Sequence, residues 1–254
     1  MRKITLKHTP PAGLARQLSE DLNASQLEAA TAPDGYNLIL AGPGSGKTRV
    51  ITYRVAWLIG RRTPAESILL ATFTRRAARE MVDRLGGLVG NEAGRVWAGT
   101  FHHVGNRLLR RHARELGFES NFTILDGEDQ TDLIRLAMDD GGLTSKEKLA
   151  PKPSQVQHLI SYAVNTRKPL EAVVEETAGD LVDWTEHIRK VADAYAARKR
   201  ASNCMDYDDL LVQWLRLLTE HPARLAEQGK MFRHILVDEM QDTNALQIEI
   251  VERI

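Results

Sequence analysis

Apolar and polar positions follow two different patterns along this chain. From residue 22 to about residue 112, short aliphatic runs alternate with longer segments in which apolar residues keep helical spacing. The short runs predict strands buried in a parallel sheet, and they are residues 37–40, 67–71 and 95–98. One longer segment places four apolar residues on a single helical face: Ile51, Val55, Leu58 and Ile59. Strands that alternate with helices predict βαβ units.

A second pattern begins near residue 114. From there to residue 203 the apolar residues keep helical spacing and the strand pattern is missing, which predicts a helical block. The buried-strand pattern returns at residues 234–238 and is followed by a predicted helix. The predicted boundaries are 1–20 for an extended lead-in, 21–113 with 204–254 for one α/β domain, and 114–203 for a helical subdomain inserted into it.

Composition and charge narrow the class of protein. The 254 residues contain 34 Lys and Arg and 34 Asp and Glu, so a strongly basic or acidic tail protein is excluded, although a local basic groove is not. The single cysteine, Cys204, excludes an intramolecular disulfide and a multi-cysteine metal site. No apolar run approaches the length of a membrane span, and the N-terminus does not resemble a signal peptide. We therefore expect a soluble cytoplasmic protein without a membrane partner.

A glycine-rich loop follows the first predicted strand and leads into the first predicted helix. It consists of Ala41, Gly42, Pro43, Gly44, Ser45, Gly46, Lys47 and Thr48. The spacing matches a phosphate-binding loop, except that the strict pattern has glycine where Ala41 stands. Such a loop turns consecutive backbone N–H groups towards phosphates, and the helix N-terminus adds the positive end of its dipole. We predict nucleotide binding, with Lys47 on the outer phosphates and Thr48 on Mg²⁺.

Two acidic residues, Asp238 and Glu239, end the last predicted strand. A carboxylate at the C-terminal edge of a parallel sheet, beside a phosphate loop, is where Mg²⁺ is held, so Asp238 is the predicted second metal ligand. Glu239 is the predicted base that orients and deprotonates the attacking water. An acidic pair after a strand is also common simply as negative charge at a helix N-terminus. Beside a phosphate loop, the pair favours an ATPase motor over a kinase.

Six segments resemble, in order, the motifs of the UvrD/Rep/PcrA-like superfamily 1 DNA helicases. They are residues 22–26 (Q motif), 41–49 (motif I), 72–78 (motif Ia), 99–103 (motif Ib), 205–211 (the return from the helical insertion) and 238–242 (motif II). Met240 stands where the family generally has an aromatic residue, Arg75 and Arg76 where Asn-Lys is common, and His103 where serine is usual. These departures are conservative. The family's motifs III to VI, with their arginine fingers, do not occur in this sequence.

The resemblance implies a fold and a nucleotide site. The fold is α/β, a RecA-like P-loop NTPase with a parallel sheet and an inserted all-helical subdomain, and the cofactors are ATP and Mg²⁺. Gln26 would contact adenine, residues Ala41 to Arg49 would bind the nucleotide, and Gln241 would couple the γ-phosphate to the DNA-contacting motifs. The implied catalytic residues are Lys47, Asp238, Glu239 and Gln241, and the implied metal ligands are Thr48 and Asp238.

Motifs Ia and Ib imply a DNA-contacting surface at the ends of the second and third predicted strands. Its implied members are Thr72, Phe73, Thr74, Arg75, Thr100, Phe101, His102, His103 and Arg107. The two phenylalanine rings would stack on bases, and the hydroxyl and imidazole groups would bond phosphates or sugars. Phe73 and Phe101 are equally compatible with core packing, and the arginines that follow motif Ib are equally compatible with a solvated helix face.

The whole enzyme implied by the resemblance is an ATP-dependent 3′–5′ DNA helicase. Its partners would be single-stranded DNA, junctions of single- and double-stranded DNA, and a second RecA-like lobe that supplies the arginine fingers. We expect this chain by itself to bind nucleotide and DNA weakly, to hydrolyse ATP poorly and not to unwind. One alternative is a freestanding one-lobe ATP- or DNA-binding module without motor activity, and another is a relative fused to a C-terminal nuclease.

Overall fold

The computed structural model describes residues 12–140 and 150–254, which divide into two compact units. The first unit contains residues 12–104 and 226–242, and the second contains 105–140, 150–225 and 243–254. These units differ from the predicted domains, since the second unit takes in residues 105–113, 204–225 and 243–254 of the predicted α/β domain. A division by compactness does not test which residues form a RecA-like domain, and the predicted boundaries stay a prediction.

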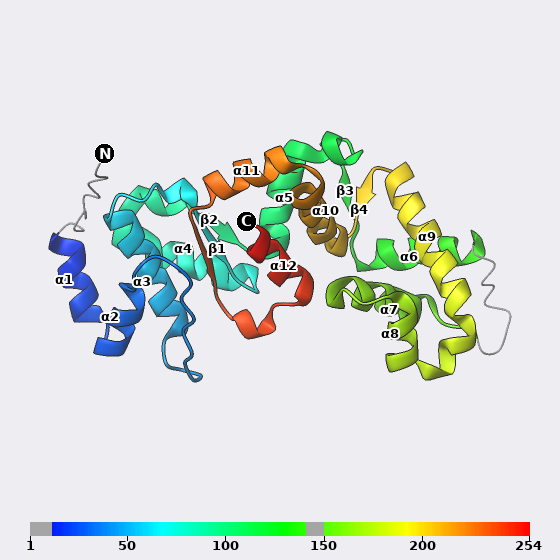
Figure 1. Ribbon diagram of the computed structural model, residues 1–254, viewed down its shortest axis with the longest axis horizontal. Coiled ribbons are helices and arrows are strands. Elements are labelled where there is room, and N and C mark those ends of the chain that lie inside the picture. The colour runs from blue at the N-terminus through cyan, green and yellow to red at the C-terminus, as the bar shows by residue number, and fades with distance from the viewer. Residues whose placement is uncertain (1–11, 141–149) are drawn as a thin grey trace. The chain divides into compact units, whose positions relative to one another are not determined.

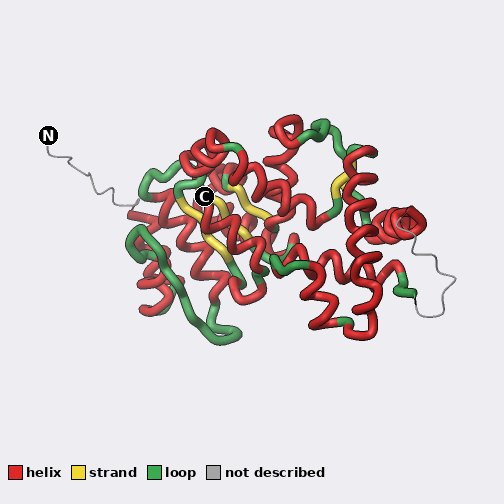
Figure 2. Tube along the Cα trace, turned by 45° about the vertical axis from the view of Figure 1, so that its right-hand side comes forward, coloured by secondary structure: helices red, strands yellow, loops and turns green. Residues whose placement is uncertain are grey.

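Helices make up most of the described chain, as Figures 1 and 2 show. The α-helices are α1 (Ala12–Asp21), α2 (Ala24–Ala30), α3 (Lys47–Gly60), α4 (Arg75–Val89), α5 (Phe101–His112), α6 (Gly127–Asp140), α7 (Pro153–Thr166), α8 (Leu170–Thr177), α9 (Thr185–Ala201), α10 (Tyr207–Glu220), α11 (Pro222–Met231) and α12 (Ala245–Arg253). The strands are β1 (Ile68–Ala71), β2 (Trp97–Gly99), β3 (Thr123–Ile124), β4 (Cys204–Met205) and β5 (His234–Val237). Among these helices, none combines the length and the apolar character that crossing a bilayer needs.

A three-stranded parallel sheet in the order β2-β1-β5 runs through the first unit. In the register, Leu70 of β1 lies opposite Ala98 of β2 on one side and opposite Leu236 of β5 on the other. All four residues of β1 are buried, as its continuous aliphatic run predicts. The strands predicted near residues 67–71, 95–98 and 234–238 are therefore confirmed, and so is their parallel arrangement.

The strand predicted at residues 37–40 is absent from the described structure. Leu38 and Leu40 are 77% and 85% exposed, and the described sheet ends at β5 without pairing to them. An apolar run becomes a strand only when a neighbouring strand supplies partners for its backbone N–H and C=O groups. The prediction of a buried strand here is wrong for this chain, because its apolar pattern is present but the described residues offer it no partner strand.

Helices α1, α3 and α4 contribute to the core of the first unit. The predicted helical face is confirmed in α3, where Val55 and Leu58 are buried in one cluster with Ile68. Residues 12–20, predicted as extended, instead form most of α1, and Leu14 and Leu18 lie in the same cluster. The extended prediction is wrong because apolar residues four positions apart share a helical face that can be buried. Residues 1–11 of the predicted lead-in lie outside the described residues.

The second unit is predominantly helical between residues 114 and 203, as predicted. Ile134 of α6, Val156 of α7 and Ile188 of α9 are completely buried in one core cluster. One exception is a two-residue parallel ladder, in which β3 pairs with β4. A ladder of two residues is too short to leave an alternating pattern in the sequence, so hydrophobic periodicity does not predict it.

Candidate nucleotide and DNA site

The phosphate loop lies in the first unit and continues directly into α3. Gly44 and Gly46 have φ angles of 73° and 86°, in the left-handed region that favours glycine, and Gly46 is the N-cap of α3. Residues 41–45 are exposed. An exposed glycine-rich loop therefore precedes the N-terminus of a 14-residue helix, which is the arrangement that binds phosphate.

Lys47 is held over this loop by weak contacts. Its Nζ donates to the carbonyl oxygens of Ala41 and Gly42, at 3.3 Å in each case. Both acceptors are neutral, and hydrogen bonds between an ammonium group and a charged oxygen are shorter and stronger. The geometry leaves Lys47 ready to exchange these carbonyl contacts for phosphate oxygens.

Thr48 and Asp238, 190 positions apart in the sequence, meet in the first unit. The Thr48 hydroxyl donates to Oδ2 of Asp238 at 3.1 Å. The Asp238 backbone N–H donates to the carbonyl of Ala71 at 2.9 Å, which fixes the residue at the end of β5. Burial raises the pKa of the Asp238 carboxyl, and the hydrogen bond from Thr48 opposes that shift. These contacts place the two predicted metal ligands side by side.

The donor set of Thr48 and Asp238 fits Mg²⁺. Within residues 12–140 and 150–254, no group of three or more His, Cys, Asp and Glu side chains could hold a metal ion. Thr48 and Asp238 offer two hard oxygen donors at the end of the phosphate loop. Mg²⁺ is usually bound through one or two protein ligands together with water and substrate phosphates, so a set of this size is sufficient.

The acidic turn, which we define as residues 238–242, has an unusual backbone. Glu239 has a φ angle of 53°, which is uncommon for a residue other than glycine and is found at functional sites. The side-chain amide of Gln241 donates to the Glu239 carboxylate, and the 3₁₀ turn Met240–Asp242 follows. The predicted base and the predicted coupling residue are therefore hydrogen-bonded neighbours.

Gln26 connects α2 to the phosphate loop. Its Oε1 accepts from the Asn23 backbone N–H at 3.1 Å, completing a capping box at the start of α2. Its Nε2 donates to the Ser45 carbonyl at 2.9 Å. The amide retains one N–H and one oxygen lone pair, and this donor and acceptor side by side match N7 and N6–H₂ of adenine.

Asp21 and Tyr53 belong to this region but were not among the predicted site residues. The Tyr53 hydroxyl donates to Asp21 Oδ2 at 2.5 Å, and Asp21 Oδ1 lies 3.8 Å from the Arg49 guanidinium. Partial burial, and then the bond to Asp21, raise the pKa of Tyr53. Asp21 ends α1 and Tyr53 lies within α3, so only folding brings them together and no local pattern could have indicated it.

The residues predicted to contact DNA follow β1 and β2, whose ends lie side by side because Ala71 is opposite Gly99. After β1, Phe73 is 63% exposed, Thr74 caps α4 by accepting from Ala77 N–H, and Arg75 is exposed. Thr72 is different, since it is 2% exposed and its backbone N–H donates to the Gly99 carbonyl. Phe73, Thr74 and Arg75 thus form an exposed group at this edge of the sheet.

After β2 the placement is mixed. Thr100 accepts from the backbone N–H of His103, and the His103 side chain is exposed while that of His102 is half-buried. Phe101 is only 4% exposed, so its ring packs in the core and does not present a face to bases. Arg107 is exposed and lies in the second unit, where partial burial and neighbouring positive charge lower its pKa. Stacking stays a prediction for Phe73 and has no support at Phe101.

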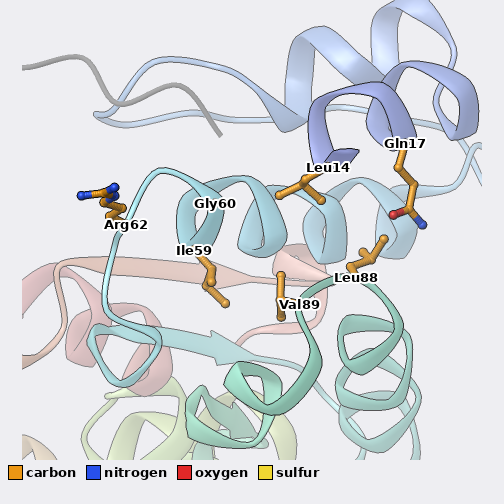
Figure 3. A pocket seen from close by; sticks show the side chains of 7 residues that line it. All are labelled: Leu14, Gln17, Ile59, Gly60, Arg62, Leu88 and Val89. Carbon is orange, nitrogen blue, oxygen red and sulfur yellow. The ribbon is translucent and has the colours of Figure 1, made fainter. Parts of the chain in front are cut away.

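A pocket in the first unit lies at the opposite end of α3 from the phosphate loop (Figure 3). Ile59 and Gly60 from that end of α3 line it together with Leu14 of α1 and Leu88 of α4. Because α3 begins at Lys47 and rises about 1.5 Å per residue, the length of the helix separates this pocket from the site described above. The pocket contains none of the predicted site residues.

Comparison with known proteins assigns the chain to a family. A phosphate loop and an acidic strand end meet at one sheet edge, as expected of a nucleotide-binding class of protein. The family model described as "UvrD/REP helicase N-terminal domain" matches residues 22–254. The chain belongs to this family.

Individual relatives agree with the family model. The chain is 36% identical over 249 residues to "ATP-dependent DNA helicase UvrD1" of Mycobacterium tuberculosis and 37% identical over 240 residues to "ATP-dependent DNA helicase PcrA" of Staphylococcus aureus. The alignments cover 96% and 92% of this chain but 32% of each relative. The chain therefore spans about a third of the length of the curated relatives it matches.

Proposed function

We propose that this chain is the ATP-binding and DNA-binding N-terminal part of an ATP-dependent DNA translocase that moves 3′ to 5′ on single-stranded DNA and unwinds at junctions with duplex DNA. The observation that carries the proposal is the hydrogen bond between Thr48 and Asp238. It joins the phosphate loop to the acidic turn in the way that a nucleotide–Mg²⁺ site requires. The matching family and the names of the relatives support the same class of activity.

Each group in this site has a defined proposed role. The backbone N–H groups of residues 41–48, apart from Pro43, and the Lys47 ammonium bind the phosphates. Gln26 binds adenine, and Arg49 also binds the nucleotide. Thr48 and Asp238 would hold Mg²⁺, which neutralises phosphate charge when bound. Glu239 takes a proton from the attacking water. Gln241, which is hydrogen-bonded to Glu239, couples the γ-phosphate to the DNA-contacting residues after β1 and β2.

The DNA surface that we propose consists of the exposed residues after β1 and β2. Phe73 offers an exposed aromatic face for a base, and Arg75 offers charge for a phosphate. Thr74, Thr100 and His103 add polar groups at the same edge. The contacts are to the DNA backbone and to base faces, which suits movement along any sequence.

We also propose that this part works with a second RecA-like lobe, while the first lobe is formed by residues 21–113 and 204–254 and carries the helical subdomain 114–203. Residues 36–40 support this proposal, because an exposed apolar stretch is typical of a surface that another part of a protein covers. Its exposed apolar side chains are Tyr36, Leu38, Ile39 and Leu40. Arginine fingers from another lobe supply much of the hydrolysis rate in such enzymes. We therefore expect this chain alone to bind ATP and hydrolyse it slowly.

The test is a calorimetric titration of the chain with a non-hydrolysable ATP analogue, with and without Mg²⁺. We expect Mg²⁺ to tighten binding of the analogue. Asp238→Asn should weaken that binding about tenfold, because it removes the negative charge at the metal site. Asp83→Asn, at an exposed acid of α4, is the matched control and should bind like the unmodified chain. Equal affinity with and without Mg²⁺, or no binding at all, would contradict the proposal.

The alternative of a non-motor module has its own readout. Slow hydrolysis that rises when the remaining part of a longer protein is present would indicate half of a motor. If the chain binds ATP but does not hydrolyse it, either alone or with the remaining part present, the freestanding module is favoured.

A further inference from the structure

In the second unit, the side-chain amide of Asn165 joins three helices. Its Nδ2 donates to Asp208 Oδ1, near the start of α10, at 2.8 Å. Its Oδ1 accepts from Nδ2 of Asn244 at 2.6 Å. Nδ2 also donates within α7 to the Ser161 carbonyl at 2.9 Å. The donor and acceptor sides of one amide are therefore both used, and each reaches a different helix.

Asn244 is the N-cap of α12, so its bond to Asn165 fixes the start of that helix. Its Oδ1 accepts from the backbone N–H of Gln247 at 2.9 Å, while its Nδ2 is committed to Asn165. A second link lies nearby, where the guanidinium of Arg167, the C-cap residue of α7, donates to Glu249 of α12 at 3.0 Å. The last turn of α7 is therefore tied to α12 at two points.

The chain enters α12 directly from the acidic turn. Asn244 follows Asp242 by only two positions. The connection is therefore too short to absorb a change in the conformation of residues 238–242 before the cap of α12. Such a change is expected when a cation is bound, because Thr48 and Asp238, which now contact each other directly, must then also turn oxygen lone pairs towards the cation.

We propose that Asn165 is a positioning residue that couples the state of the acidic turn to α7 and, through Asp208, to α10. This inference rests on the proposed nucleotide site. The coupling runs along the chain from the acidic turn to Asn244, and then through hydrogen bonds to helices of the second unit. It makes the helical region between residues 114 and 203 responsive to nucleotide, although no residue of that region is a predicted ATP ligand.

The test is hydrogen exchange of the full chain, measured peptide by peptide with and without Mg²⁺ and a non-hydrolysable ATP analogue. In the unmodified chain we expect the ligand to slow exchange both in the phosphate loop and in residues 161–167 of α7. The α7 effect should be about fivefold, the lower end of ordinary coupling between two sites. Asn165→Asp should abolish the α7 response, because its carboxylate cannot donate to Asp208 and is repelled by it, which draws the side chain away from Asn244. The phosphate-loop response should stay intact.

Two further variants make the result specific. Asn165→Asp combined with Asp208→Asn restores one donor and one acceptor with their roles exchanged, so the α7 response should return. Gln157→Glu is the matched control, since it makes the same amide-to-acid change in α7 at a residue bonded to Gln130 and Thr131 of α6, and it should respond normally.

A variant that preserves the cap guards against simple unfolding. Asn244→Asp retains an oxygen for the Gln247 N–H but loses the donor to Asn165, so it should lose the α7 response without weakening α12. If α7 responds equally in the unmodified chain, Asn165→Asp and Asn244→Asp, the coupling role is overturned. It is overturned as well if the phosphate loop responds and α7 never does. If the phosphate loop itself shows no response, the proposed function is wrong, and this inference, which rests on it, is wrong as well.

Discussion

Two lysines of this protein lie in opposite environments. Lys47, in the first unit, donates to two backbone carbonyls at 3.3 Å and to no other group among the described residues. Lys199, in the second unit, is 7% exposed and lies 2.6 Å from the carboxylates of both Asp206 and Asp209. The Tyr195 hydroxyl donates to Asp206 as well, at 2.9 Å. Lys199 has its charge fully compensated by the protein, whereas Lys47 does not.

This difference separates a structural cluster from a ligand site. Buried charges persist when they are paired and hydrogen-bonded within the protein, and the Lys199 cluster satisfies that condition by joining α9 to the start of α10. Burial and the neighbouring Asp206 carboxylate raise the pKa of Asp209 to about 6, while Lys199 opposes the shift. A charge that is left with weak, replaceable contacts on an exposed loop is instead available to an incoming anion.

Lys199→Met should give the largest effect on stability. We expect the free energy of unfolding at pH 7 to fall by about 3–5 kcal/mol, because the buried Asp206 and the partly buried Asp209 lose their ammonium partner. Without Lys199, the pKa of the Asp209 carboxyl in the folded state rises further above its value in the unfolded chain. The folded state then binds more protons than the unfolded state, so the variant should gain stability as the pH falls from 7 towards 5.

Urea unfolding at pH 7 and pH 5.5 measures this prediction. Lys190→Met, at an exposed lysine of the same helix, should change the unfolding free energy by less than about 0.5 kcal/mol. An equal loss at both pH values for Lys199→Met would indicate that lost packing, and not charge, is responsible.

The same substitution at Lys47 should have the opposite effect: little change in stability and a large change in ATP affinity. Lys47→Met should leave the free energy of unfolding within about 0.5 kcal/mol of the original. Its ATP affinity should be about tenfold to a hundredfold weaker, because a charged hydrogen bond contributes about 1.5–3 kcal/mol. Paired unfolding and nucleotide titrations measure both quantities. A large loss of stability together with unchanged ATP affinity would reverse the assignment of the two lysines.

Gln26→Glu should have a smaller effect that is specific for the base. The carboxylate still accepts from Asn23 but cannot donate to the Ser45 carbonyl or to adenine N7, so ATP affinity should fall about tenfold and the preference for ATP over GTP should shrink. Competitive titration with the two nucleotides measures the ratio. The control is Gln155→Glu, which holds the same capping-box position in α7 and should leave both affinities unchanged.

Arg75→Ala should have the smallest effect. We expect affinity for single-stranded DNA to fall a few-fold and the slope of log affinity against log salt to become less steep by about 0.7, the value for one lost phosphate contact. Fluorescence anisotropy at several salt concentrations measures both. The adjacent Arg76 is paired with Glu80 at 2.9 Å, so Arg76→Ala should change the slope less. Equal slopes for the original chain and Arg75→Ala would remove Arg75 from the DNA surface.

Much of the candidate site could be predicted because its chemistry is written in local patterns. Glycines at fixed spacing, followed by Lys47 and Thr48, define the phosphate loop from the sequence alone. The aliphatic run before Asp238 likewise identifies β5 and the sheet edge at which it ends. The C-terminal end of β5 places Asp238 at the edge of the parallel sheet, where a phosphate loop is expected, and Thr48 meets Asp238 there although residues 37–40 do not form a strand.

The sequence could not distinguish apolar residues that are buried from those that are exposed. Residues 37–40 have the pattern of a buried strand yet lie unpaired, whereas Phe101 has the appearance of a stacking residue yet is buried. Pairing of strands and burial of rings depend on segments far away in the sequence, and the pattern of a short run contains no information about them.

The sequence by itself determined where the phosphate loop, the acidic turn and the three paired strands of the sheet lie, since each depends on residues within a few positions of one another. Only the tertiary structure decided which charged groups are left available. Lys47 and Lys199 cannot be told apart by composition, and neither can Asn165 be recognised as a joint between α7, α10 and α12. The Asn165 contacts join residues 43 and 79 positions apart. The two lysines differ in burial and in the conformation of the chain around them, which is decided only when the chain folds.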